Sequence, residues 1–169
     1  MTNQNSKQGT EIILGLGQMR ASREEELVLI SLGLGSCVAI CAYDPISKVG
    51  GMAHMVLPRS SDGRSNEPNP KFVDCAIPML LEEMKELGAL KSRLIVKIVG
   101  GAEMMKAQSP NGTLNIGPQN VQAVETLLEE LSLPLRSADI GGTHGRTARL
   151  YLDSGKLLVS AVGGARREL

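Results

Sequence analysis

The chain has 169 residues, which suits one compact domain with its own core, and 42% of them are hydrophobic and 21% charged. Eighteen Lys and Arg balance eighteen Asp and Glu, so the formal net charge is zero, and only 2% of the residues are aromatic. Proteins that bind DNA or RNA usually present a basic surface, and single-strand binders add aromatic stacking platforms. This composition therefore excludes a nucleic-acid partner and argues against a polybasic membrane anchor.

The polar residues 1–10 predict a disordered tail before a single domain at residues 11–169. The first apolar patch, Ile12 to Leu16, is too short for a signal peptide or a membrane span, and charged residues interrupt every later apolar run. The chain contains three cysteines, an odd number that fits a reducing compartment when no secretion signal is present. We therefore expect a cytoplasmic protein without membrane insertion.

Short apolar runs separated by Gly, Ser, Asp and Pro predict buried strands in the first third of the chain. These runs cover residues 12–16, 27–32, 38–42 and 52–57. The polar, breaker-rich segment 58–70 then predicts a mobile surface loop.

The apolar spacing changes to a helical period over residues 72–87, and Gly88 is placed to end that helix. Pro78 lies inside the pattern, so the helix either begins near Pro78 or is kinked there. A second helical pattern covers residues 118–131. Further strands are expected at residues 94–99, 150–152 and 156–162. The sequence thus predicts one strand-rich domain of mixed α and β structure.

Common cofactor and hydrolase motifs are missing. The chain has no P-loop and no GxSxG element, and Gly33 to Val38 departs from GxGxxG at the last glycine. A zinc site would have to use Cys37, Cys41 and His54, but their spacing is loose and a fourth ligand is not evident. We expect no metal or organic cofactor, and we expect Cys41 and Cys75 to be unreactive thiols buried among apolar neighbours.

The segment from Ser31 to Cys37, with the sequence SLGLGSC, is the candidate site. Its glycines permit a sharp bend and a close approach of the backbone, whose N–H groups near Gly35 and Ser36 can face an oxyanion. His54 follows Cys37 by 17 positions (54 − 37), and two antiparallel strands would return it alongside the thiol. A neighbouring histidine lowers the thiol pKa and supplies an acid and base. The alternative is a core histidine bonded to a carbonyl and a small buried cysteine.

The motifs at Leu32 to Pro45 and Gly50 to Pro58 resemble the CheD family, the chemoreceptor glutamine deamidases of bacterial chemotaxis. The resemblance continues in order through residues 71–74, 97–104, 116–120 and 139–146. It implies packed mixed β-sheets with flanking helices, an α+β sandwich-like domain similar to the cysteine deamidase domains of bacterial toxins. It also implies roles for three side chains: Cys37 as nucleophile, His54 as catalytic histidine and Ser31, where the family usually has Thr, as the residue that orients the histidine.

The implied activity is that of a protein-glutamine glutaminase. Cys37 would form a thioester with a receptor glutamine and release ammonia, so the implied partner is a cytoplasmic helix of a methyl-accepting chemoreceptor. Two alternatives stay open. One is a receptor methylesterase or a mixed amidase-esterase, and the other is a non-catalytic regulatory partner of a CheC-type phosphatase.

Other residues within the resemblance have simpler structural interpretations. Gly100, Gly101 and Gly117 are expected to be turn and cap glycines. His144 is expected to be a loop residue, and Arg146 is expected to pair with an acidic side chain.

Overall fold

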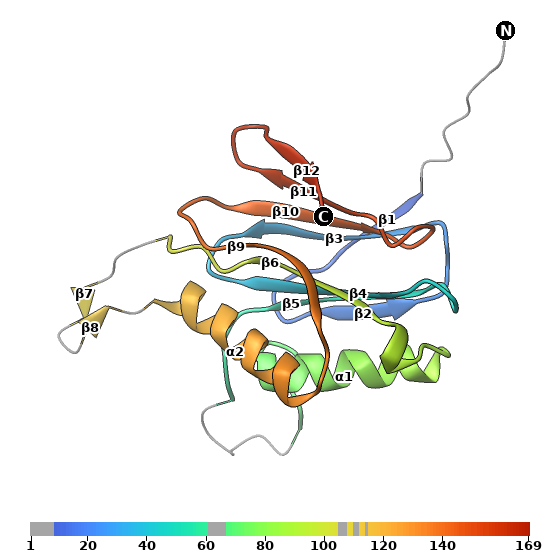
Figure 1. Cartoon of the computed structure of the whole chain (residues 1–169). Helices are drawn as coiled ribbons and strands as arrows, with labels where there is room; N and C mark the ends of the chain where they lie inside the picture. The colour runs from blue at the N-terminus through green and yellow to red at the C-terminus, as the bar shows by residue number, and fades with distance from the viewer. Residues whose placement is uncertain (1–8, 61–66, 105–107, 110–111, 114) are drawn as a thin grey trace, which may run out of the picture.

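The computed structural model describes residues 9–60, 67–104, 108–109, 112–113 and 115–169, which form two β-sheets and a layer of helices (Figure 1). The first sheet has the strand order β1 (Thr10–Ile13), β3 (Leu27–Leu34), β10 (Arg146–Tyr151), β11 (Leu157–Ala161) and β12 (Arg166–Glu168). The second has the order β2 (Met19–Ser22), β5 (Val49–Met55), β4 (Val38–Asp44), β6 (Ile95–Gly100) and β9 (Leu135–Ile140).

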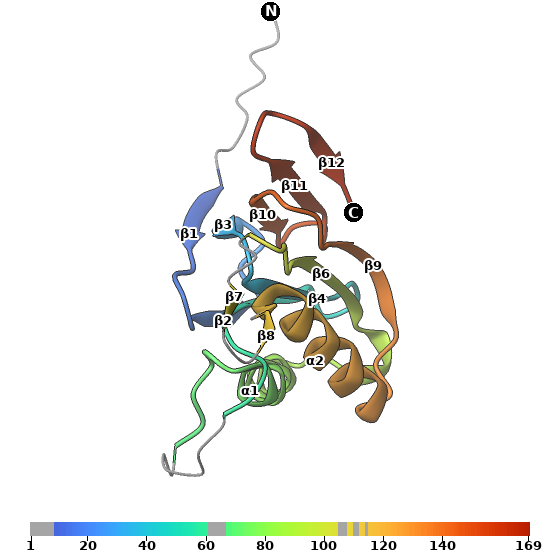
Figure 2. The ribbon, with the colours of Figure 1, turned by 90° about the vertical axis from the view of Figure 1, so that its left-hand side faces the viewer.

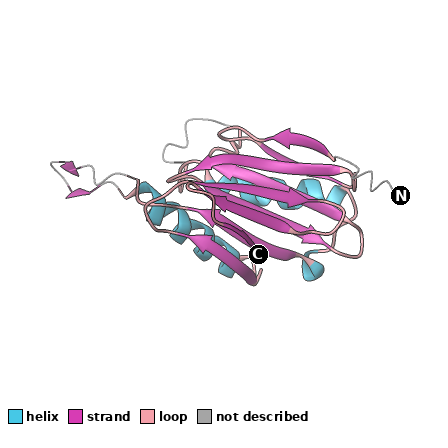
Figure 3. Cartoon of the chain, turned by 90° about the horizontal axis from the view of Figure 1, so that it is seen from above, coloured by secondary structure: helices cyan, strands magenta, loops and turns pink. Residues whose placement is uncertain are grey.

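Helices α1 (Val73–Glu86) and α2 (Ile116–Glu130) cover the face of the second sheet that points away from the first (Figures 1 and 2). Seen from above in Figure 3, the strands lie over both helices. A short 3₁₀ helix at Lys91–Arg93 and a small hairpin, β7 (Gln108–Ser109) with β8 (Gly112–Thr113), complete the elements of the described residues. The expected α+β class, with packed mixed sheets and flanking helices, is confirmed. The similarity to toxin deamidase domains stays a prediction.

The second sheet is buried on both faces, which explains the continuous apolar runs in the sequence. Every residue of β4 and β5 is buried. Between the two sheets, the packed side chains include Leu27, Leu29, Leu34, Ala148, Leu150 and Val159 from the first and Ala39, Cys41, Met52 and Val99 from the second. Beneath the second sheet, a separate core joins Val38, Ile40, Ala53, Met55, Val96 and Ile98 to Ile77, Leu80, Met84, Val124 and Leu128 of the helices.

The start of helix α1 decides between the two alternatives that Pro78 left open. The helix begins at Val73 and runs through Pro78, so a start near Pro78 was wrong. Pro78 is tolerated on the exposed side of the helix. The expected end of the helix is confirmed. Gly88 lies just beyond the helix with a φ of 99°, and its N–H donates to the Lys85 carbonyl in the last turn.

The segments for which we predicted disorder or mobility lie partly outside the described residues. Residues 1–8 of the expected tail and residues 61–66 of the expected loop are not described. Thr10, which the sequence assigned to the tail, is part of β1, where it pairs with Leu27. Parallel pairing with β3 therefore orders the chain at least one residue earlier than its composition indicates.

Asp44 ends β4 at the turn into β5 and is fully buried. Its carboxylate accepts hydrogen bonds from the Arg93 guanidinium at 2.6 Å and from the backbone N–H groups of Leu90 at 3.0 Å and Ile46 at 2.9 Å. Burial acts to raise the pKa of Asp44, but these hydrogen bonds outweigh it and hold the pKa well below its usual range. Asp44 thereby joins the β4–β5 turn to the segment that precedes β6.

We expect acid to weaken the fold through Asp44. Because its folded pKa is depressed, its stabilising contribution is complete above the unfolded pKa of about 4 and is lost as the pH falls below that value. Asp44→Asn should lower the free energy of unfolding at pH 7 by about 3 kcal/mol, since Arg93 loses its charged partner. Urea unfolding at pH 7 and below pH 4 measures both effects. Asp153→Asn, at an exposed aspartate, is the matched control, and equal stability of the two variants would contradict the expectation.

Candidate active site

Cys37 lies where the chain crosses from the first sheet to the second. Residues 35–37 connect β3 to β4, and backbone hydrogen bonds hold this turn from one side: Ala102 N–H donates to Gly35 O and Gly101 N–H donates to Cys37 O, both at 2.8 Å. The side chain of Asn120 adds a hydrogen bond to Ser36 O at 2.9 Å. The turn that carries the thiol is therefore fixed by the end of β6 and by α2.

Gly100 at the end of β6 and Gly117 in α2 permit close approach of the backbone here. Gly100 has a φ of 116°, and a Cβ at this position would collide with the Cys37 carbonyl. A Cβ at Gly117 would collide with the Ala102 carbonyl. These residues are more than turn or cap glycines, since Gly100 lets the end of β6 approach the Cys37 carbonyl and Gly117 lets α2 approach Ala102.

His54 reaches the same region from β5. Strands β4 and β5 are antiparallel, with Val38 opposite Met55 and Ala39 opposite His54, so the expected return of the chain is confirmed. Cys37 lies just before β4, two residues before Ala39, and packs against the core between the sheets, so the alternation of side chains would place it diagonal to His54 on the same face. The Cβ atoms of such diagonal neighbours are about 7 Å apart, within reach of a ring and a thiol.

The imidazole of His54 is almost fully buried and oriented by a backbone carbonyl. Its Nδ1 lies 3.1 Å from Leu14 O, and a carbonyl only accepts, so Nδ1 carries the proton. This leaves a lone pair on Nε2, which is buried and has no hydrogen-bond partner among the described residues. Leu14 lies in the segment that connects β1 to β2. The neutral tautomer is thus the one that can accept a proton at Nε2.

Ser31 does not make the hydrogen bond that we expected. It is fully buried in β3, and its hydroxyl donates to Met52 Sδ at 3.2 Å, while the Leu14 carbonyl occupies His54 Nδ1. Met52 lies two residues before His54 on the same face of β5. Ser31 therefore contacts the strand that carries the histidine, not the ring itself. A role for Ser31 in the reaction stays a prediction.

Burial also changes the expected charge state of the pair. It raises the pKa of the Cys37 thiol, although a hydrogen bond from the residue's own backbone N–H opposes the rise. It lowers the pKa of His54, although the hydrogen bond to Leu14 opposes the fall. Both directions favour a neutral thiol beside a neutral imidazole near pH 7. The lowered thiol pKa expected from the sequence, and with it a thiolate–imidazolium pair, is therefore disfavoured, because Cys37 and His54 border the core between the sheets.

The other two cysteines differ from each other. Cys41 is fully buried between the sheets, and burial raises its pKa to about 12, so the expected inert core thiol is confirmed in its packing. Cys75 is only half-buried on α1, so the expectation of a buried thiol was wrong there. Across the described residues, no three or more His, Cys, Asp or Glu side chains are grouped as a metal site requires.

A second loop supports the glycines beneath the cysteine turn. Arg146 is buried and donates from Nε to Asp139 Oδ1 at 2.9 Å, which confirms its expected acidic partner. Its Nη1 also donates to the carbonyls of Gly141 at 2.8 Å and His144 at 3.3 Å. Gly141 N–H in turn donates to Gly100 O at 3.0 Å. Arg146 therefore shapes the loop at Gly141, and this loop bonds to Gly100, the glycine that packs against the Cys37 carbonyl.

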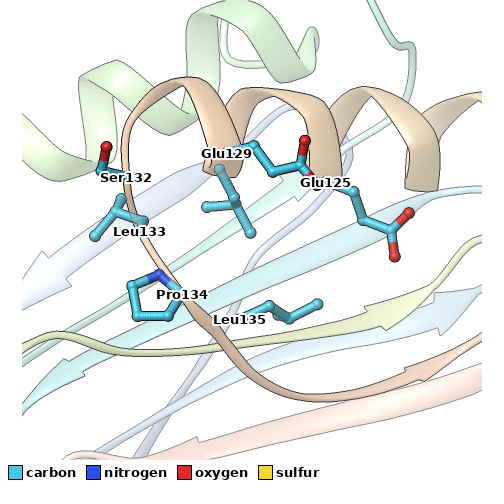
Figure 4. A pocket seen from close by; sticks show the side chains of 7 residues that line it. Glu125, Glu129, Ser132, Leu133, Pro134 and Leu135 are labelled. Carbon is cyan, nitrogen blue, oxygen red and sulfur yellow. The ribbon is translucent and has the colours of Figure 1, made fainter.

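A separate hollow of about 600 Å³ lies between the end of α2 and the start of β9 (Figure 4). It is lined by Glu125, Leu128, Glu129, Ser132, Leu133, Pro134 and Leu135. Its lining offers neither a thiol nor an imidazole, so the candidate catalytic chemistry stays at Cys37 and His54. None of the helices in the described part of the chain has the length and apolar character needed to cross a membrane.

Comparisons with known proteins show which family this chain is similar to. The model of the family described as CheD chemotactic sensory transduction matches residues 56–161. A Symbiobacterium thermophilum protein named probable chemoreceptor glutamine deamidase CheD is 41% identical, over 92% of this chain and 95% of its own length. The chemoreceptor glutamine deamidase CheD of Thermotoga maritima is also 41% identical, over 92% of this chain and 94% of its own. A solved Neisseria meningitidis structure of family DUF152 covers 78% of this chain and 59% of its own, at 8% identity and a TM-score of 0.41.

Proposed function

The chain belongs to the CheD family, and from this membership we propose that it is a chemoreceptor glutamine deamidase. It hydrolyses the side-chain amide of receptor glutamines to glutamate and releases ammonia. The observation that supports the site assignment is the register of β4 and β5. It returns His54, whose Nε2 has no partner among the described residues, opposite Ala39, two residues after the partly exposed thiol of Cys37. A structural histidine would be expected to use both ring nitrogens in hydrogen bonds.

The reaction starts from the neutral pair. As Cys37 Sγ attacks the glutamine amide carbon, His54 Nε2 takes the thiol proton, a C–S bond forms and the amide oxygen becomes an oxyanion. Backbone N–H groups of the turn at Gly35 and Ser36, with that of Cys37, stabilise this oxyanion. The support for this placement is that the N–H group of Ser36 lacks a backbone acceptor within the described part of the chain.

The oxyanion then collapses and the C–N bond breaks. The imidazolium of His54 gives its proton to the departing nitrogen, ammonia leaves and Cys37 retains the substrate as a thioester. His54, neutral again, takes a proton from water as that water attacks the thioester carbon. When the C–S bond breaks, the sulfur recovers the proton and glutamate is released. Each step uses groups of this chain, the substrate and water.

The partner in this proposal is a cytoplasmic helix of a chemoreceptor, which gives the protein a cytoplasmic location. Ser31 contributes indirectly, because its hydrogen bond to Met52 joins β3 to the strand that carries His54. The CheC-type phosphatase stays a prediction of the family resemblance, as a second partner of the same protein.

Intact-mass analysis of a receptor cytoplasmic fragment tests the proposal. Each converted glutamine should add roughly one dalton, with one ammonia released per conversion, because an amide becomes an acid. A methyl-esterified fragment is the control for the esterase alternative, since that activity releases methanol instead. A fragment with unchanged mass after prolonged incubation with the folded protein would overturn the deamidase assignment.

A further inference from the structure

Asn120 joins the two chain segments that carry the candidate catalytic pair. It lies on α2 and is fully buried. Its Nδ2 donates to Ser36 O and to Val56 O, each at 2.9 Å. Ser36 immediately precedes Cys37, and Val56 follows His54 by two residues. One side-chain amide therefore holds both the turn before Cys37 and the residues that follow β5, the strand that carries His54.

The position of this contact along the sheet indicates its role. The last pair in the β4–β5 ladder at this end is Val38 with Met55. One step beyond it, Cys37 and Val56 would face each other, but the backbone ladder no longer joins the two segments. The two hydrogens of the Asn120 amide supply a cross-link at that point, between carbonyl oxygens that cannot bond to each other.

The start of α2 is itself held against the site. A Cβ at Gly117 would collide with the Ala102 carbonyl, and the Ala102 N–H donates to Gly35 O. Asn120 projects from the next turn of the same helix, and its Oδ1 is buried without a hydrogen-bond partner among the described residues. A buried amide that leaves its own acceptor unpaired costs stability, so the contribution of Asn120 lies in the two hydrogen bonds that its Nδ2 donates.

We propose that Asn120 is a positioning residue for the deamidation reaction, setting the separation of Cys37 from His54 through the carbonyls of Ser36 and Val56. This inference rests on the proposed function. This role requires a short side chain that carries two donor hydrogens on one nitrogen. Aspartate has the same shape without those donors, and serine has only one.

Asn120→Asp is the principal test. We expect kcat on the receptor fragment to fall about 100-fold with KM nearly unchanged, because a displacement of about 1 Å between reacting groups costs a factor of that size. Gln119→Ala, which removes an exposed amide from the neighbouring position, should leave both parameters unchanged. An unchanged kcat in folded Asn120→Asp, or a rise in KM alone, would overturn the proposal.

Alkylation of the three cysteines with iodoacetamide separates positioning from general loss of structure. In Asn120→Asp, loosening of the turn should raise the rate at Cys37 several-fold relative to half-buried Cys75, while fully buried Cys41 stays unlabelled. The ratio of labelling at Cys37 to labelling at Cys75 can be measured without deamidation. If the wild-type protein shows no activity, the proposed function is refuted, and the labelling ratio still tests whether Asn120 holds the cysteine turn. An unchanged ratio refutes the positioning role.

Asn120→Ser is the second variant, used if labelling of Cys41 shows that Asn120→Asp does not fold. It keeps one donor hydrogen, and we expect kcat to fall about 10-fold with a smaller change in the Cys37 to Cys75 ratio. Wild-type kcat together with a wild-type ratio in folded Asn120→Ser would overturn the proposal.

Discussion

Replacing Cys37 with alanine is expected to reduce ammonia release from the receptor fragment by about 10⁴-fold or more, because the covalent route to the thioester is removed. The fold should be unaffected, since the side chain is only partly buried at the edge of the core between the sheets. Intact-mass analysis then shows a receptor fragment without the gain in mass, and thermal unfolding shows an unchanged transition.

Cys75→Ala is the matched control for this variant. Cys75 is another half-buried thiol of the same chain, located on α1, and its removal should leave turnover at the wild-type rate. Retention of activity in Cys37→Ala, or its loss in Cys75→Ala without unfolding, would assign the nucleophile elsewhere.

Replacing His54 with glutamine is expected to lower kcat by roughly 10³-fold, within the usual range for removal of a general acid–base group. The pH profile makes the role specific. Burial lowers the pKa of His54, so wild-type kcat/KM should stay level through neutral pH and fall only below the ordinary histidine value of about 6.5. In His54→Gln this acid limb should disappear. Residual activity should then rise toward alkaline pH as the Cys37 thiol, whose pKa burial raises, loses its proton.

His144→Gln provides the comparison, because His144 is the other histidine of the chain and is exposed on the loop before β10. It should keep the wild-type rate and the wild-type acid limb. An acid limb centred above pH 6.5 in the wild type, or one that persists in His54→Gln, would contradict the assignment of His54 as the base.

Three of the strands that the sequence failed to predict share one physical property. In β2, β9 and β12 the side chains are mostly half-buried or exposed, and each of these strands lies at the edge of its sheet. An edge strand is stabilised by backbone pairing with its neighbour, and that pairing does not require an apolar run in the sequence. The central strands β4 and β5 were predictable because both of their faces are covered.

The same distinction applies to the candidate site. Cys37 and His54 are visible in the sequence as a glycine-flanked thiol and a histidine one hairpin away, and the resemblance to CheD adds their roles. The hydrogen-bond partner of His54 could not be predicted from the sequence. It is the backbone carbonyl of Leu14, and every residue has a backbone carbonyl, so no residue type marks it. Ser31, the residue that the sequence offered for this task, instead bonds to Met52.

By itself, the sequence determined a strand-rich domain of mixed α and β structure, both helices, strands β4 and β5 and the candidate pair of Cys37 and His54, while the resemblance to CheD implied the packed sheets and the family. These follow from side-chain periodicity and from motifs that are local in the chain. The tertiary structure alone decided which groups orient the pair and which charge state it favours, because both depend on segments distant in sequence. The crossing from β1 to β2 supplies the carbonyl of Leu14, α2 supplies the amide of Asn120, and burial beside the core between the sheets favours the neutral forms of thiol and imidazole.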